Sequence, residues 1–115
     1  MLLYQYILIK HMKNKKCINK NISLAFNDLS KFFRVIGEDN RLRILCLLKD
    51  GELCVCDIYE NLELSQNLVS SHLRVLKDLK LIELRQEKQK NYYSINKKVF
   101  KKYNLLLTKF FKSYE

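Results

Sequence analysis

The chain has 115 residues, the size of one domain, and its 22 basic and 12 acidic side chains give a formal net charge of +10. Apolar residues make up 48% of the chain, with two glycines and no proline, which excludes a disordered, linker-like or collagen-like chain. A domain of this size has little room for an enclosed active site, so a small binding module or a dimer is favoured.

The positive charge is concentrated at the two ends of the chain. Residues 1–20 carry +5 and residues 85–115 carry +7, whereas residues 21–84 carry −2. This distribution favours a polyanionic partner. The alternative is that the positive charge only reflects amino-acid composition. Lys outnumbers Arg by 17 to 5, and Asn and Ile are abundant, as in proteins from AT-rich genomes.

The N-terminal segment is too short to span a membrane. MLLYQYILI is apolar for nine residues, against about 20 for a transmembrane helix, and no basic region precedes it as in a signal peptide. We therefore expect a cytoplasmic protein, in which disulfides are improbable. Residues 1–21 are predicted to form a flexible basic arm that contains Cys17. Met12 offers a second start, which would make residues 1–11 a mis-assigned start.

Residues 22–115 are predicted to form a mainly α domain with a small β-hairpin. The elements expected in chain order are helices at 22–37, 39–51, 54–62 and 65–80, strands at 81–85 and 92–95 around a polar hairpin tip at 86–91, and a last helix from residue 96. Asp39 and Ser65 are expected to cap the second and fourth helices. This order is that of a winged helix-turn-helix flanked by two further helices.

The last helix carries more apolar side chains than one end of a short chain can easily bury. We expect it to pair with the first helix across a two-fold dimer interface. The residues predicted at this interface are Leu29, Phe33, Phe100, Tyr103, Leu107, Phe110 and Phe111. The alternative is a core helix that packs within a single chain.

The predicted helix at 65–80 has the features of a helix that reads DNA. It follows a connection of helix-turn-helix length, Glu63 to Ser65, and no acidic residue occurs from Ser65 through Lys77. Gln and Asn can pair with adenine, Arg with guanine, and Ser hydroxyls with phosphates. We predict contacts to double-stranded DNA from Ser65, Gln66, Asn67, Ser70, Ser71, His72 and Arg74 on this helix, and from Arg85, Lys88 and Lys90 on the wing. An ordinary solvated polar surface is the alternative.

Cys54-Val55-Cys56 forms a C-x-C motif at the start of the third helix, where the helix dipole favours thiolate. Thiolates select soft ions such as As(III), Sb(III), Cd(II) and Pb(II), with Zn(II) less suited. Side chains two residues apart in a regular helix point about 200° apart. Both sulfurs therefore reach one ion only if the first turn is irregular. Two incidental thiols are the alternative.

Three segments between Arg34 and Ile95 together resemble the ArsR/SmtB family of winged-helix metalloregulatory repressors. They are NRLRILCLLKDGELCVCDI, LSQNLVSSHLRVLKDLKLI and the wing ending NYYSI, of which ELCVCD resembles the metal box of arsenic- and cadmium-type members. The resemblance implies a homodimeric repressor that leaves its operator, expected to be an inverted repeat, when a toxic thiophilic ion binds. It places Gln66, Asn67, Ser70, Ser71, His72 and Arg74 on the DNA-reading helix and Cys54 and Cys56 in the metal box.

Cys17 and Cys46 are the two candidates for a third ligand of an ion bound by Cys54 and Cys56. Cys46 lies in the apolar run at 44–48 and is expected to be a buried small hydrophobe. Cadmium-type relatives use cysteines of the N-terminal arm, which favours a site of Cys17, Cys54 and Cys56. Three sulfurs suit As(III), Sb(III) or Pb(II) better than Zn(II). Tyr59 stands where some arsenic-type relatives have a third cysteine, and the last helix has no His for a zinc site between C-terminal helices.

Two other functions stay open. The first is a repressor of the same fold that responds to thiol oxidation or to no metal. The second is a small thiol protein or metal carrier. An enzyme is not expected, because the sequence has no C-x-x-C motif, no βαβ pattern and no Gly-rich phosphate loop, and we expect no organic cofactor.

Overall fold

The computed structural model describes residues 20–115, with their side chains from Phe26 onward. Most of the predicted basic arm, the alternative start and Cys17 lie outside the described residues. The first helix begins at Lys20, so it includes the last two residues that the sequence had assigned to the arm.

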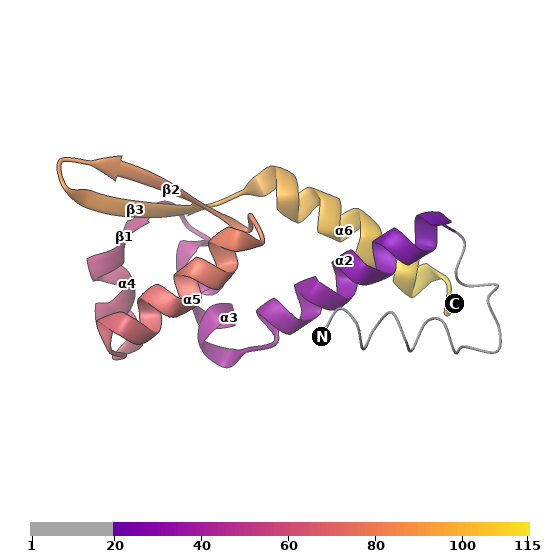
Figure 1. Ribbon diagram of the computed structural model, residues 1–115, viewed down its shortest axis with the longest axis horizontal. Helices are drawn as coiled ribbons and strands as arrows, with labels where there is room; N and C mark the ends of the chain where they lie inside the picture. Colours follow the sequence, from indigo (N-terminus) through magenta and orange to yellow (C-terminus); the bar gives the residue numbers. More distant parts are fainter. Residues whose placement is uncertain (1–19) are drawn as a thin grey trace.

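The described residues form five helices and three short strands (Figure 1). In chain order these are α2 (Lys20–Ile36), α3 (Asp39–Leu48), β1 (Leu53–Cys54), α4 (Val55–Leu62), α5 (Gln66–Asp78), β2 (Ile82–Glu87), β3 (Lys90–Ile95) and α6 (Lys97–Lys112). The predicted order of helices and hairpin is confirmed, and the fold is a winged helix-turn-helix. The strand β1 was not predicted, because two residues are too few to show a strand pattern.

The sheet is antiparallel in the order β1-β3-β2. The hairpin of β2 and β3 is the wing, and its strands pair from Ile82 opposite Ile95 to Glu87 opposite Lys90. The predicted six-residue tip is therefore wrong: the turn is only Lys88 and Gln89, with φ of 47° and 68°. Both residues take the left-handed conformation, which matches the twist of a two-residue hairpin turn without using glycine.

Side chains cap the N-termini of α3 and α5. Ser65 Oγ accepts a hydrogen bond from the Leu68 amide at 3.3 Å, which confirms the predicted cap of α5. The predicted cap of α3 is off by one residue. Glu38, not Asp39, caps this helix, and its Oε2 accepts from the Arg41 amide at 2.9 Å.

The core lies where α3, α4, α5 and β2 meet. Its fully buried side chains are Ile44, Leu48, Ile58, Val69, Leu73, Leu76, Leu81 and Ile82. Because α5 contributes three of them, one face of this helix is packed into the core.

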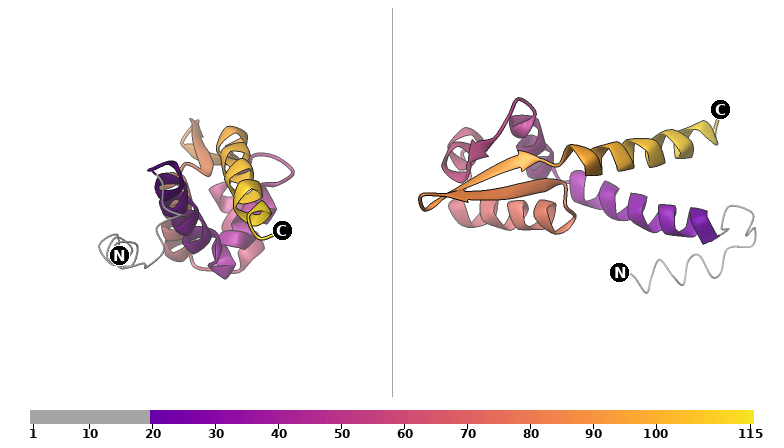
Figure 2. Two further views of the ribbon diagram at one scale, coloured as in Figure 1. Left: turned by 90° about the vertical axis from the view of Figure 1, so that its right-hand side faces the viewer. Right: turned by 90° about the horizontal axis from the view of Figure 1, so that it is seen from above.

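The helices α2 and α6 run antiparallel, side by side, and project from the winged body (Figures 1 and 2). They give the molecule its length of 54 Å against 25 and 23 Å across. Phe32 stacks on Tyr103 with ring centroids 4.3 Å apart. Leu29 and Tyr103, two residues of the predicted dimer interface, are already buried within the single chain.

Four large apolar side chains stay exposed on these two helices, Phe26, Phe33, Leu105 and Phe111, and Tyr114 is exposed just after α6. Two of them, Phe33 and Phe111, belong to the predicted interface. Phe100, Leu107 and Phe110 are half-buried. Within residues 20–115, no helix has the length and the apolar run that crossing a membrane requires.

Candidate DNA-binding surface and thiol site

A three-residue connection turns the chain from α4 into α5. Glu63 ends α4 in the left-handed conformation, with φ 54° and ψ 37°, and its amide donates to the Tyr59 carbonyl at 3.1 Å. Two residues later Ser65 caps α5. The helix-turn-helix connection expected from the sequence is therefore present, and it delivers the N-terminal end of α5 to the surface.

The two sides of α5 differ sharply in polarity. Val69, Leu73 and Leu76 face the core. The exposed residues that the sequence assigned to DNA are Gln66, Asn67, Ser70, Ser71 and Arg74, with Ser65 as the exposed cap. The structure brings these six side chains onto one end and one outer face of a helix, which is the geometry of a recognition helix.

His72 lies on the opposite side of α5 and is left out of this surface. Its side chain is 11% exposed, and its Nδ1 lies 3.7 Å from Glu38 Oε2 without a hydrogen-bond partner. Positions 69, 72, 73 and 76 share one helix face, so a side chain at position 72 is directed inward. Glu38 also caps α3, and Arg41 Nε donates to the Val35 carbonyl at 2.6 Å. His72 thus belongs to a polar junction of α2, α3 and α5.

The three basic residues predicted on the wing have different environments. Arg85 is engaged by two carboxylates: its Nη2 lies 2.7 Å from Glu52 Oε1 and its Nη1 lies 2.6 Å from Glu87 Oε2. These hydrogen bonds hold the pKa of Glu52 below its ordinary range and that of Arg85 above its own. Lys88 and Lys90 are exposed at the tip and have no ion pair among the described residues. The two lysines are therefore the freer cations of the wing.

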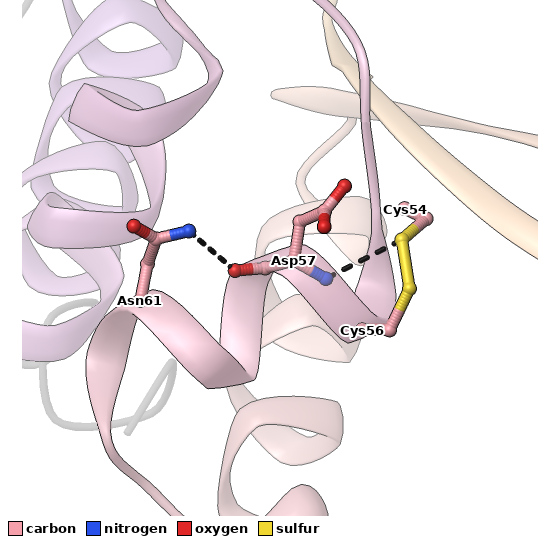
Figure 3. Close-up of a disulfide and its surroundings, with 4 residues drawn as sticks. All are labelled: Cys54, Cys56, Asp57 and Asn61. Atoms are coloured by element: carbon pink, nitrogen blue, oxygen red, sulfur yellow. Dashed lines mark hydrogen bonds between the residues drawn. A yellow bond between two sulfur atoms is a disulfide. The ribbon is translucent and has the colours of Figure 1, made fainter.

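The two cysteines of the C-x-C motif form a disulfide (Figure 3). This overturns the expectation that disulfides are improbable. Cys54 ends β1 with extended backbone, φ −73° and ψ 157°, and caps α4 from outside the helix, while Cys56 lies within its first turn. The Cα atoms are 5.3 Å apart. The 200° separation expected for two helical residues does not hold, because only Cys56 is helical.

Cys54 is also the N-cap of α4. Its Sγ accepts a hydrogen bond from the Asp57 amide at 3.3 Å, the role that a Ser, Thr or Asp oxygen ordinarily plays (Figure 3). Cys54 is buried and Cys56 is half-buried. The sulfur pair is therefore built into the start of α4, whose far end leads directly into α5.

Asp57 adds a carboxylate to the two sulfurs. One oxygen of Asp57 and both Sγ atoms lie within 4.8 Å of one another, which makes this trio a possible ion site among the described residues. Asn61 Nδ2 donates to the Asp57 carbonyl at 2.7 Å one turn further along α4 (Figure 3). Asp57 was not predicted as a ligand, although its place directly after the C-x-C motif was the available signal.

The expectation that Cys46 is buried is wrong. It is an exposed free cysteine on α3. Ile44 and Leu48, four residues apart, face the core, so position 46 between them faces solvent. Nothing in residues 20–115 brings Cys46 to the sulfur pair, and Cys17 lies outside the described residues.

Comparison with known proteins now identifies the family. The sequence pattern described as "Bacterial regulatory protein, arsR family" matches residues 38–83, which include α3, α4, α5 and the start of β2. The chain is 36% identical over 73 residues to the arsenical resistance operon repressor of Staphylococcus aureus, covering 64% of this chain and 70% of that one. The chain belongs to the arsR family. It is therefore a DNA-binding transcriptional repressor and not an enzyme.

Other arsR-family relatives carry different ions in their names. A cadmium resistance regulatory protein CadC homolog of Staphylococcus aureus is 40% identical over 70 residues, which are 60% of this chain and 58% of that one. Among solved structures, HlyU from Vibrio cholerae N16961 superposes with a TM-score of 0.63 at 32% identity, covering 77% of this chain and 94% of that one. The arsR-family fold is thus supported by both sequence and structure.

Proposed function

We propose that this arsR-family repressor binds its operator as a homodimer and releases it when a soft ion binds Cys54 and Cys56. One observation carries the proposal: the two sulfurs converge at the N-terminus of α4, beside the Asp57 carboxylate. Relatives named for arsenical and for cadmium resistance support the class of ion. The reduced form of the pair is the one able to bind an ion, because thiolates are the ligands.

The donor set fits a soft ion. As(III), Sb(III), Cd(II) and Pb(II) supply strong bonds to thiolate sulfur, and As(III) or Sb(III) suits three donors in a pyramid. Cys54 and Cys56 supply two sulfurs, and the third donor is Cys17, as proposed from the sequence, or Asp57, which the structure adds. Zn(II), which prefers a tetrahedral set of four, fits less well.

The coupling to DNA runs through the cap of α4. As long as Cys54 Sγ accepts a hydrogen bond from the Asp57 amide, this bond joins the first turn of α4 to the end of β1. When Cys54 becomes a ligand, that amide loses part of its acceptor and the first turn adjusts. Because α4 packs on α5, the adjustment reaches the exposed face of α5 that is proposed to contact DNA. The coupling is reciprocal, so DNA should weaken ion binding by the same factor by which the ion weakens DNA binding.

The DNA contacts proposed on α5 are Ser65, Gln66, Asn67, Ser70, Ser71 and Arg74. Lys88 and Lys90 are proposed to contact the sugar-phosphate backbone from the wing, which positions the protein without specifying sequence. Phe33 and Phe111 are proposed at the dimer interface, with the exposed apolar side chains beside them on α2 and α6. A two-fold dimer would prefer an inverted repeat.

The test is fluorescence anisotropy of a labelled fragment of the protein's own promoter. Reduced protein is bound to the fragment, and arsenite, antimonite, Cd(II), Pb(II) or Zn(II) is added. We expect arsenite or antimonite to release the DNA most effectively. The double variant Cys54→Ser/Cys56→Ser should bind DNA and ignore the ion, whereas Cys46→Ser, the matched control at an exposed cysteine, should respond as the wild type does. Selective DNA binding that no ion reverses would contradict the sensor.

The disulfide favours a second candidate, release on thiol oxidation. Cys54 and Cys56 lose two protons and two electrons to an oxidant such as diamide or peroxide when the sulfur–sulfur bond forms. A titration with diamide in the same assay separates the two. If diamide releases the DNA and arsenite does not, the chain responds to oxidation and not to metal.

A further inference from the structure

Leu68 occupies an unexpected place on α5. The sequence pattern counts it with Val69 and Leu73 as an apolar position of the helix, yet its side chain is 41% exposed while theirs are buried. It lies in the first turn of the helix, where its amide donates to Ser65 Oγ at 3.3 Å. The backbone of Leu68 therefore serves the cap, and its side chain is left at the surface.

The position of Leu68 distinguishes it from the other exposed apolar residues. The large hydrophobic side chains exposed on the described part of the chain are Phe26 and Phe33 on α2, Leu42 on α3, Leu68, and Leu105, Phe111 and Tyr114 from residue 105 onward. Within α4, α5 and the wing, as described, Leu68 stands alone. On the helix surface its neighbours three residues away, Ser65 and Ser71, are exposed and polar.

The major groove of DNA offers a matching apolar group. Each base pair presents hydrogen-bond donors and acceptors there, and thymine adds its C5-methyl group. Amide and hydroxyl side chains suit the donors and acceptors, whereas a branched aliphatic side chain suits only the methyl group. Burying Leu68 against that group would remove apolar surface of both partners from water.

We propose that Leu68 contacts the C5-methyl group of a thymine in each operator half-site and so specifies an A·T pair at that position. The proposal rests on the proposed docking of α5 in the major groove. It makes Leu68 a specificity-determining residue that acts by apolar contact, beside polar residues that act by hydrogen bonds.

The experiment replaces thymine by uracil, which removes the methyl group and leaves the hydrogen-bonding edges unchanged. Each thymine of one half-site of the promoter fragment is replaced singly by deoxyuridine, and the Kd of the reduced, ion-free protein is measured by anisotropy. At one position we expect the wild type to bind about fourfold more weakly, the effect of about one buried methyl group. Leu68→Ala should bind the natural operator more weakly and show no further loss with uracil at that position.

Leu42→Ala is the matched control, because Leu42 is an exposed leucine on α3, 48% exposed against 41% for Leu68. It should keep the full uracil penalty. Thermal melting confirms that both variants fold. If no uracil position weakens the wild type, or if Leu68→Ala keeps the same penalty, the proposal for Leu68 is overturned while selective operator binding stands. If the wild type does not distinguish its operator from unrelated DNA, the proposed function falls as well.

Discussion

Arg85 on the wing binds Glu52, 33 positions earlier in the chain, through two hydrogen bonds: Nε to Oε2 at 3.0 Å and Nη2 to Oε1 at 2.7 Å. Glu52 lies two residues before Cys54. The ion pair therefore connects the wing, which is proposed to contact DNA, with the segment that leads into the thiol site.

This connection predicts a pH dependence. Because Arg85 lowers the pKa of Glu52, the unfolded chain binds a proton at this group more readily than the folded one. Its contribution to stability is present above the ordinary pKa of Glu and is lost as the pH falls through the lowered pKa. NMR titration should place the Glu52 midpoint below the ordinary range in the wild type and within it in Arg85→Gln. The same midpoint in both proteins would contradict the role of Arg85. Arg43→Gln is the control, because Arg43 pairs with Asp39 and not with Glu52, so it should leave the Glu52 midpoint unchanged.

The wing lysines are predicted to dominate the salt dependence of DNA binding. Lys88→Gln or Lys90→Gln should reduce the slope of log K against log salt by about 0.9, the value for one phosphate contact. Arg85→Gln should change the slope less, because Glu52 and Glu87 already engage Arg85. Anisotropy titrations at several salt concentrations measure all three variants. A larger effect of Arg85→Gln would show that the arginine leaves its carboxylates to bind phosphate.

Oxidation of the sulfur pair is predicted to exclude the ion. Disulfide sulfurs are not thiolate ligands, so oxidised protein should bind no arsenite, and reduction should restore binding. Conversely, arsenite bound to the reduced protein should slow disulfide formation by diamide. Isothermal titration calorimetry and mass spectrometry after alkylation measure the two effects. The Cys46→Ser variant keeps both, whereas equal arsenite binding before and after oxidation would place the ion elsewhere.

The exposed aromatic side chains of α2 and α6 predict a concentration-dependent assembly. Phe33→Ser and Phe111→Ser remove exposed apolar surface, 40% and 56% exposed in the single chain, so the folded monomer should be little affected. Sedimentation velocity should show the dimer weakened in both variants, with Leu42→Ser unchanged. An unaltered dimer in both would move the interface to another surface.

Core packing gives a prediction for stability. Leu76 is fully buried between α5 and its neighbours, so Leu76→Ala should lower the free energy of unfolding by about 2–5 kcal/mol. Leu42→Ala, at an exposed position, should stay within about 0.5 kcal/mol of the wild type. Denaturant unfolding at one fixed protein concentration compares them. Equal losses in both variants would mean that Leu76 is not part of a close-packed core.

Local patterns predicted α5 well, because the Ser65 cap and the apolar spacing both act within a few residues of each other. They did not predict β1, whose pairing with β3 joins Cys54 to Tyr92, far away in the sequence. The length of the wing was underestimated because its polar strands pair through the backbone, which the side-chain pattern does not reveal.

At the candidate site, residue types were easier to predict than directions. The C-x-C motif indicated a sulfur pair, but the extended backbone of Cys54 that brings the sulfurs together appears only in the fold. Cys46 is exposed where burial was expected, and His72 is buried where a contact to DNA was expected. The packing of a helix against other elements decides which of its faces is buried, and the apolar character of single residues does not.

The paired helices α2 and α6 come from opposite ends of the described chain, and the residues of α5 and the wing lie between them in the sequence. If these helices determine which subunits pair, then subunit specificity and operator specificity are determined by separate stretches of sequence. Each can change by mutation without disturbing the other. A cell with several such regulators could thus keep their subunits from mixing through changes at the chain ends alone, with every operator preference left as it was.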